Sequence, residues 1–332
     1  MRGSVTQTRT VLLGLLLTGW SAAQTGSFQP GSLQSSASQS GPGAPGMTSP
    51  NVSAGANPAP LVSSPAASPT ISSVNTISPV NALISALKKS LLAEARGQAV
   101  LEMVFPPSST PLRRAHALPR LTAVPALIRR NFVVTVEPQP EQVAGRPATR
   151  YTLTPNNSQA ARWTLWIDLQ WNVPLAYQER TPDGRLARRA ELRSVNPALA
   201  WLTATSQHTP ASGTPAGIPA LKKALLKALP GLSLPAGFEP LSVQRRTGAA
   251  GNTSTEVLLG DGLNLLALVV SPRPVQAASG VAVRRLGGHS VWLVGNLPQN
   301  TLEDALGGIR QLNVQAVSGW PGTFAAPAAS DQ

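Results

Sequence analysis

Few residues of this sequence could perform acid–base, nucleophilic or metal chemistry, and their spacing does not favour it. The 332-residue chain has three histidines: His116, His208 and His289. None lies near another, or near a carboxylate at the spacing of metal ligands, and no HExxH, GxSxG or P-loop pattern occurs. Asp261, His289 and Ser290 could be assembled into a hydrolase triad, but the two glycines before His289 indicate a hairpin turn, where such residues are usually solvated. We therefore predict no catalytic residue, no metal site and no cofactor.

Aromatic residues are better candidates for binding. Trp163 and Trp166 fall on opposite faces of a predicted strand, and Tyr177 lies in the next predicted strand. Such side chains offer a large apolar area with few rotors, so they can line a groove for a lipid or a peptide. A place in the hydrophobic core would explain them as well. By alternation, Trp166 and Tyr177 are the stronger groove candidates of the three.

Arginines dominate the formal net charge of +13 and form the pairs Arg245-Arg246 and Arg284-Arg285. Because guanidinium binds carboxylate and phosphate bidentately, both pairs are candidate contacts for an acidic partner. Charges that protect the edge of a sheet would explain them equally well.

The aromatic candidates belong to the most regular stretch of the sequence, Arg150 to Val195. Period-two alternation predicts a strand at Arg162 to Leu169, and Pro174 marks the start of another at Leu175 to Arg180. A Thr-Pro-Asp-Gly turn then leads into a third predicted strand, Leu186 to Val195. Earlier strands are predicted at Asn131 to Glu137 and at Tyr151 to Thr154. Together these indicate an antiparallel sheet with one face on a core.

A helix is predicted to pack on this sheet. Ser78 is the expected N-cap and Pro79 the first helical residue. Apolar residues then follow at helical spacing: Val80, Leu83, Ile84, Leu87 and Leu91. Residues Gln98 to Phe105 could form a short strand, whereas Pro106 to Pro125 shows no pattern that we can assign.

The second half of the chain predicts a separate unit. After a stretch rich in Pro, Ser, Thr and Gly, Ile218 to Leu229 predicts a short basic amphipathic helix. That helix could lie on an anionic membrane surface or pack between domains. Hairpin turns at Gly260-Asp261-Gly262 and Gly287-Gly288, followed by a closing helix, predict a small sheet with one terminal helix.

The N-terminus indicates export. Met1 to Ala23 has a basic start, an apolar run and small residues at its end, as in a secretory signal peptide; a membrane anchor is the alternative. Gln24 to Asn75, rich in Ser, Gly and Pro, is predicted to be a disordered tether. The absence of cysteine excludes disulfides and lipidation of an N-terminal cysteine. We expect a soluble periplasmic protein, whose anionic partners would be lipid headgroups, envelope polysaccharide or acidic protein, and not nucleic acid.

Two parts of the sequence, in order, resemble the MucB/RseB-type periplasmic regulators of envelope-stress sigma factors. WTLWIDLQWNVPLAYQERTPDGRLARRAEL, Trp163 to Leu192, is similar to the hairpin that this family shares with lipoprotein carriers. The segments Leu234 to Arg246, Leu258 to Val270 and Gly287 to Ile309 resemble the family's C-terminal domain.

The resemblance implies a fold and a function. The fold is α+β: an antiparallel, lipoprotein-carrier-like half-barrel, shortened at its N-terminal side, with a packing helix, then a small α+β domain of antiparallel strands and a terminal helix. The function is that of a binding protein and not an enzyme: it holds the periplasmic segment of a membrane-anchored anti-sigma factor, and a lipid or lipopolysaccharide fragment is its second expected ligand.

The predicted organisation has six parts: signal peptide 1–23, tether 24–75, half-barrel domain 76–195, linker with a short basic helix 196–233, C-terminal domain 234–313 and flexible tail 314–332. Two other functions remain open. The half-barrel could carry lipid or lipoprotein, or the tether and basic surface could attach the protein to an envelope polymer.

Overall fold

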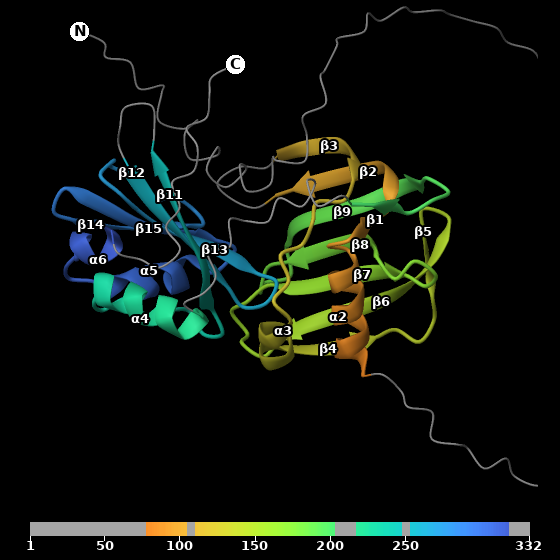
Figure 1. Cartoon of the computed structure of the whole chain (residues 1–332), viewed down its shortest axis with the longest axis horizontal. Coiled ribbons are helices and arrows are strands. Elements are labelled where there is room, and N and C mark those ends of the chain that lie inside the picture. The colour runs from red at the N-terminus through yellow and green to blue at the C-terminus, as the bar shows by residue number, and fades with distance from the viewer. Residues whose placement is uncertain (1–77, 105–109, 203–216, 248–252, 319–332) are drawn as a thin grey trace, which may run out of the picture. The chain divides into compact units, whose positions relative to one another are not determined.

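Two antiparallel sheets and the helices that cover them make up the computed structural model (Figure 1). The structure describes residues 78–104, 110–202, 217–247 and 253–318. The predicted signal peptide and tether, residues 203–216 of the predicted linker and residues 319–332 of the predicted tail lie outside the described residues. All described residues belong to a single compact unit. None of the helices in these ranges is both long enough and apolar enough to cross a bilayer.

The first sheet has eight strands. Its order is β3-β2-β9-β8-β7-β6-β4, and β5 pairs with β6. The bounds are β2 Arg96–Met103, β3 Thr110–Ala117, β4 Phe132–Val136, β5 Glu141–Val143, β6 Arg146–Pro155, β7 Arg162–Asp168, β8 Pro174–Arg180 and β9 Leu186–Val195. The three strands predicted between Arg162 and Val195 are therefore confirmed. Strand β3 falls where no pattern could be assigned, because it lies at the edge and carries exposed charge at Arg113 and Arg114 in place of apolar alternation.

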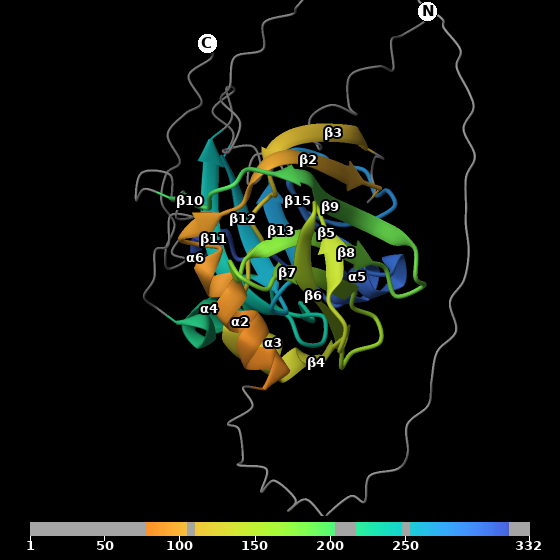
Figure 2. The same ribbon diagram turned by 90° about the vertical axis from the view of Figure 1, so that its right-hand side faces the viewer.

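Two helices lie across one face of this sheet, α2 (Pro79–Lys89) and α3 (Pro125–Asn131) (Figures 1 and 2). Leu83, Ile84 and Leu87 of α2 are buried, as predicted, in a core shared with strands β6 to β8. Ser78 occupies the N-cap position, but its side chain makes no capping hydrogen bond. The prediction that Leu91 continues the packed face is wrong, because the helix ends at Lys89 and Leu91 is half exposed.

A two-stranded ribbon follows α2. Strand β1 (Ala93–Glu94) pairs with β10 (Ala200–Trp201), so that Ala93 lies opposite Trp201. Ala93 is fully buried while Trp201 is largely exposed.

The second sheet has the order β11-β12-β13-β15-β14. Its strands are β11 Glu239–Thr247, β12 Thr253–Gly260, β13 Leu265–Ser271, β14 Val281–Leu286 and β15 His289–Gly295, and its helices are α4 Ile218–Ala228, α5 Gln299–Gly307 and α6 Val314–Ser318. Leu221, Leu225 and Leu229 are buried in the core of this sheet. Helix α4 thus packs on its own sheet, which corrects the expectation that it packs between domains. Helix α6 begins within the stretch predicted as a tail.

Candidate functional site: a buried polar junction between the sheets

A hydrogen-bonded network joins the two sheets, and its central residue is Asn264. The indole Nε1 of Trp163 in β7 donates to Asn264 Oδ1 at 2.8 Å. Asn264 Nδ2 in turn donates to Asp261 Oδ2 at 2.8 Å and to the carbonyl of Ala161 at 3.3 Å. Trp163, Asp261 and Asn264 are all at most 4% exposed. Breaking these hydrogen bonds would leave deeply buried polar groups unpaired, which costs free energy. The network therefore holds the two sheets together in one arrangement.

The turn between β12 and β13 builds the second sheet's half of the network. Asp261 Oδ1 accepts from the backbone N–H of Leu263 at 3.2 Å and of Asn264 at 2.9 Å, so the carboxylate closes its own turn. Gly262 has φ +130°, and a Cβ there would lie 2.7 Å from the backbone nitrogen of Ile128 in α3. Only glycine allows this approach.

Leu263 carries the turn into the other sheet's core. Its side chain is 2% exposed and packs within the cluster that contains Trp163, Tyr177 and the buried leucines of α2. The carbonyl of Gly262 accepts from Val124 N at 3.0 Å, and Asn131 Nδ2 donates to the carbonyl of Asp261 at 2.7 Å. The hairpin predicted at Gly260-Asp261-Gly262 is therefore inserted into the core of the other sheet, and that core is incomplete without Leu263.

The junction contains two buried acids, Asp261, which accepts hydrogen bonds from neutral donors, and Glu179, which forms an ion pair. Burial, with a smaller contribution from the charge of Glu179, raises the pKa of Asp261 to about 6 against the opposing hydrogen bonds from Asn264 and Leu263. Glu179, 5% exposed, pairs with Arg188 and accepts from Asn296 Nδ2 of the second sheet at 2.8 Å. The Arg188 guanidinium lies 4.5 Å from the centre of the Trp163 ring. Arg188 thus forms its ion pair with Glu179, whereas Asp261 accepts hydrogen bonds from neutral donors.

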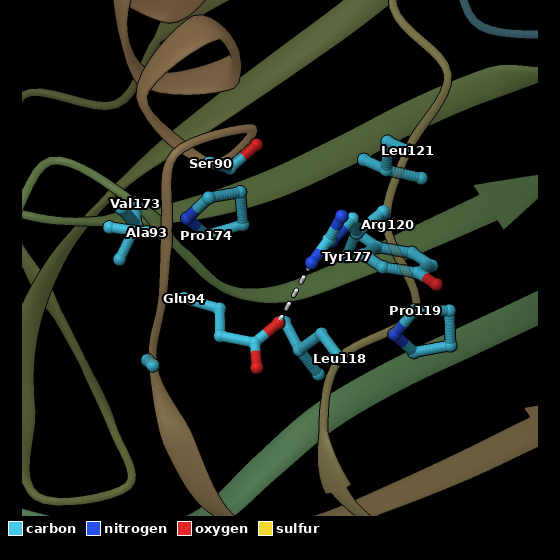
Figure 3. Close-up of a pocket in the computed structure, with 11 residues that line it drawn as sticks. Ser90, Ala93, Glu94, Leu118, Pro119, Arg120, Leu121, Val173, Pro174 and Tyr177 are labelled. Carbon is cyan, nitrogen blue, oxygen red and sulfur yellow. Dashed lines mark ion pairs between the residues drawn. The ribbon is translucent and has the colours of Figure 1, made fainter. Parts of the chain in front are cut away.

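Tyr177 lines a small cavity on the first sheet's helical face (Figure 3). Its ring lies 6.1 Å from that of Trp163, burial raises its pKa, and its hydroxyl has no hydrogen-bond partner among the described residues. The Glu94–Arg120 ion pair at 3.8 Å also borders the cavity. The cavity measures about 30 Å³, enough for one or two waters and far below the roughly 300 Å³ of a small-molecule site. The α2 and α3 side chains and Leu263 pack on this face of the sheet.

The three aromatic candidates do not form one groove. Tyr177 pairs with Leu165, which puts it on the face of Trp163, whereas Trp166 pairs with Ala176 and faces the other side. Trp163 and Tyr177 are core residues at 0% and 1% exposure. Trp166 is half-buried and its Nε1 donates to Glu141 Oε2 at 2.6 Å. Trp166 and Tyr177 therefore face opposite sides of the sheet and do not line one groove.

The Trp-x-Asp pattern of the resembling hairpin ends at Asp168, which closes the turn between β7 and β8. Asp168 is 1% exposed and receives Arg146 Nε at 2.6 Å and Nη2 at 3.1 Å. It also accepts from the backbone N–H of Gln170 and Trp171. Burial alone would raise the pKa of Asp168, but the hydrogen bonds from Arg146 and the turn hold it below its ordinary value.

The arginine pairs lie on opposite edges of the second sheet. Arg245 and Arg246 are in β11, Arg284 and Arg285 in β14, and three strands separate these edges. At about 4.8 Å per strand the pairs are roughly 19 Å apart, so they do not form one site. Arg284 and Arg285 are exposed, and Arg284 Nε donates to the carbonyl of Ile309 at 3.2 Å. The structure describes only the backbone of Arg246.

The structure also separates the residues of the hypothetical triad. Ser290 pairs with Ser271 at one end of β13, and Asp261 precedes Leu265 at the other end. That strand spans about 20 Å, so Asp261 cannot orient His289 beside Ser290. Among the described residues, no group of His, Asp and Glu side chains could hold a metal ion.

Trp163 and the turn at Asp261 were predicted from the sequence, but their partners were not. Asn264, Glu179 and Asn296 were not predicted, because no local pattern distinguishes them from exposed polar residues. They differ only because the other sheet covers each of them. The available signal was the pair of glycines around Asp261 within an apolar run, which is typical of a close backbone approach as well as of a hairpin.

Comparisons with known proteins give matches among solved structures alone. No family model matches the sequence, and no curated protein matches it. The chain is similar to a structure described as the crystal structure of MucB, with 17% identity and a TM-score of 0.47 over 69% of this chain and 96% of that one. It is similar to the Pseudomonas aeruginosa MucA/MucB complex, with 17% identity and a TM-score of 0.46 over 71% of this chain and 100% of that one. For MucB in complex with MucA(peri) the identity is 17% and the TM-score 0.45, over 70% and 98%. These structures carry the name of the family that the sequence resembles, and at these values they say nothing about individual residues or ligands.

Proposed function

We propose that this protein is a non-enzymatic periplasmic binding protein that regulates an extracytoplasmic sigma factor by holding the periplasmic segment of a membrane-anchored anti-sigma factor. One observation carries the proposal. The two sequence patterns that resemble the regulator family supply the two halves of the buried junction: Trp163 begins the first pattern, and Leu263 and Asn264 lie in the second. These residues belong both to the family-like patterns and to the buried contact between the sheets. We therefore expect them to maintain an architecture that this chain shares with the family.

The junction supports binding because it makes a rigid body from two sheets that each have open edges. Strands β3 and β4 border the first sheet, and β11 and β14 border the second. An extended segment can add to such an edge through backbone hydrogen bonds, with side-chain pockets for specificity. A segment bound in this way is withdrawn from proteases in proportion to the bound fraction.

The proposal is tested by titrating the full chain with the periplasmic segment of a single-span anti-sigma factor and following protease protection of that segment. We expect saturable binding and slower cleavage. Binding that fails at micromolar concentrations, with the chain shown to be folded by circular dichroism, would refute the proposal. Gly262→Ala is the informative variant, because it displaces the junction without touching an exposed edge. Gly288→Ala is the matched control, since a Cβ there meets nothing within 4 Å.

Lipid sensing is a further part of the proposal, and it requires the cavity at Tyr177 to enlarge. At about 30 Å³ this cavity cannot admit an acyl chain until its lining residues move. Native mass spectrometry distinguishes this from the alternative of a lipid carrier. Stoichiometric lipid in the absence of any protein partner would favour the carrier. Lipid that binds only while releasing the anti-sigma segment would favour the sensor.

A further inference from the structure

Three exposed apolar side chains gather at the ribbon that follows α2. Leu91 is 50% exposed, Leu92 52% and Trp201 69%. The backbone N–H of Leu202 donates to the carbonyl of Leu92 at 2.9 Å, and Ala93 pairs with Trp201, so the leucines and the tryptophan lie on adjoining backbone segments. We call Leu91, Leu92 and Trp201 the ribbon patch.

The backbone holds the ribbon patch in place. After Lys89, the backbone N–H of Leu91 donates to the carbonyl of Lys88 at 3.1 Å and that of Leu92 to the carbonyl of Lys89 at 2.9 Å. These tighter i to i−3 turns replace the helical pattern, so α2 ends at Lys89. Ala93 and Ala95 are buried directly after the patch and anchor β1 on the first sheet. The leucines therefore face outward from a fixed backbone, and their exposure is not fraying of a helix end.

Basic side chains surround the ribbon patch. Lys88 is exposed and Lys89 half-buried at the end of α2, and Arg96 is exposed after β1. Glu94 is the one acid of the ribbon, and it is matched by Arg96 at 2.8 Å and Arg120 at 3.8 Å. Lys88 and Lys89 form no ion pair with an acid of the described residues. The surface thus combines Trp and Leu side chains with these two lysines.

We propose that the ribbon patch docks on an anionic lipid surface. Tryptophan favours the interface between headgroups and acyl chains, leucine favours the acyl side, and lysine beside them attracts lipid phosphate. Charge complementarity distinguishes this occupant from a second copy of the chain, because two copies would bring lysines of the same sign together. Docking goes beyond the proposed function and does not depend on it. It would place the protein on the membrane that anchors its partner.

The absence of cysteine from the chain allows a site-specific test. Leu92→Cys and Leu169→Cys are each made in the full chain and labelled with an environment-sensitive dye. Leu169 is a matched control because it is also a leucine, is 53% exposed and follows β7, outside the ribbon. With phosphatidylglycerol vesicles we expect a blue shift and at least a twofold rise in emission at position 92 and none at position 169.

Vesicle co-sedimentation tests the charge requirement. Lys88→Glu/Lys89→Glu and Trp201→Ser should each weaken binding to anionic vesicles about tenfold. Lys223→Glu/Lys227→Glu, which reverses two exposed lysines on α4, should change it less than twofold. The N-terminal apolar segment is common to all variants, so it cancels in the comparison.

Three outcomes would overturn the proposal. Equal binding to phosphatidylcholine vesicles would remove the electrostatic basis. A loss in the α4 variant equal to that in the ribbon variant would move the contact elsewhere. A concentration-dependent dye shift at position 92 without vesicles would show that a second copy covers the patch. Anti-sigma binding measured without vesicles should be the same for the ribbon variants and the original chain, so failure of either proposal is distinguishable.

Discussion

Asp168 and Asp261 are two buried aspartates whose pKa values move in opposite directions. Both are at most 2% exposed and both close a turn by accepting backbone N–H groups. Arg146 binds Asp168 through two nitrogens, and the pKa of Asp168 is lowered. Asp261 has only neutral donors, and burial raises its pKa to about 6. A buried carboxylate beside a cation is a fixed structural element, whereas one among neutral donors remains sensitive to pH.

The largest expected effect on stability comes from removing the cation that pairs with Asp168. Arg146→Met keeps much of the side-chain stem but leaves Asp168 buried without its cation, which should lower the free energy of unfolding by about 4 kcal/mol. Urea denaturation measures it. Arg185→Met is the control, because the Arg185–Asp183 pair is 81% and 53% exposed, so that solvent screening should leave it with little effect on stability. Equal losses in the two variants would show that burial does not distinguish these pairs.

Asp261, which accepts from neutral donors only, should give stability a pH dependence opposite in sign to that given by Asp168. The folded pKa of Asp261, about 6, exceeds its ordinary 3.8, so its contribution is fully present below pH 4 and is lost as the pH rises to 6. The difference corresponds to about 3 kcal/mol. Asp168 has the converse effect, because its folded pKa is lowered: its contribution to stability is lost only as the pH falls below about 4.

This sign is measured by comparing the original chain with Asp261→Asn in urea at pH values from 4 to 7. The original chain should lose stability relative to the variant as the pH rises through that window. The slope is the readout, because the amide also alters the contact with Asn264. Parallel profiles would contradict the assignment.

A smaller effect is expected where the Asp261 turn meets α3. Gly262→Ala forces a Cβ to within 2.7 Å of the nitrogen of Ile128 at φ +130°, which should cost about 2 kcal/mol. Thermal unfolding followed by near-UV circular dichroism reports it, because Trp163 lies in the junction. Gly288→Ala should stay within about 0.5 kcal/mol.

The smallest effect tests a carboxylate of intermediate exposure. Glu141 accepts from Trp166 at 2.6 Å and pairs with Arg150 at 2.7 Å, with its side chain 39% exposed. Trp166→Phe removes one hydrogen bond while water can still reach the acid, so urea denaturation should show a loss of about 1 kcal/mol. A loss as large as that of Arg146→Met would mean that Trp166 belongs to the core.

Local patterns predicted much of the first sheet. Alternation located β7 to β9 within a residue or two, and proline with helical spacing located α2. The prediction failed at β3, an edge strand without an apolar face, and at Leu91, where α2 ends although the apolar spacing continues. Both failures arise where solvent exposure, which a local pattern does not record, decides the structure.

By itself, the sequence determined the period of each strand, the turns at Asp183-Gly184 and around Asp261, the lack of a metal or thiol motif and the excess of positive charge. The tertiary structure decided which of these features act together. Whether Asp261 is solvated or buried depends on Trp163, about 100 residues away in the chain, and whether Leu91 is core or surface depends on where α2 ends. Desolvation and long-range pairing set these outcomes, because both depend on neighbours in space and not on neighbours in the chain.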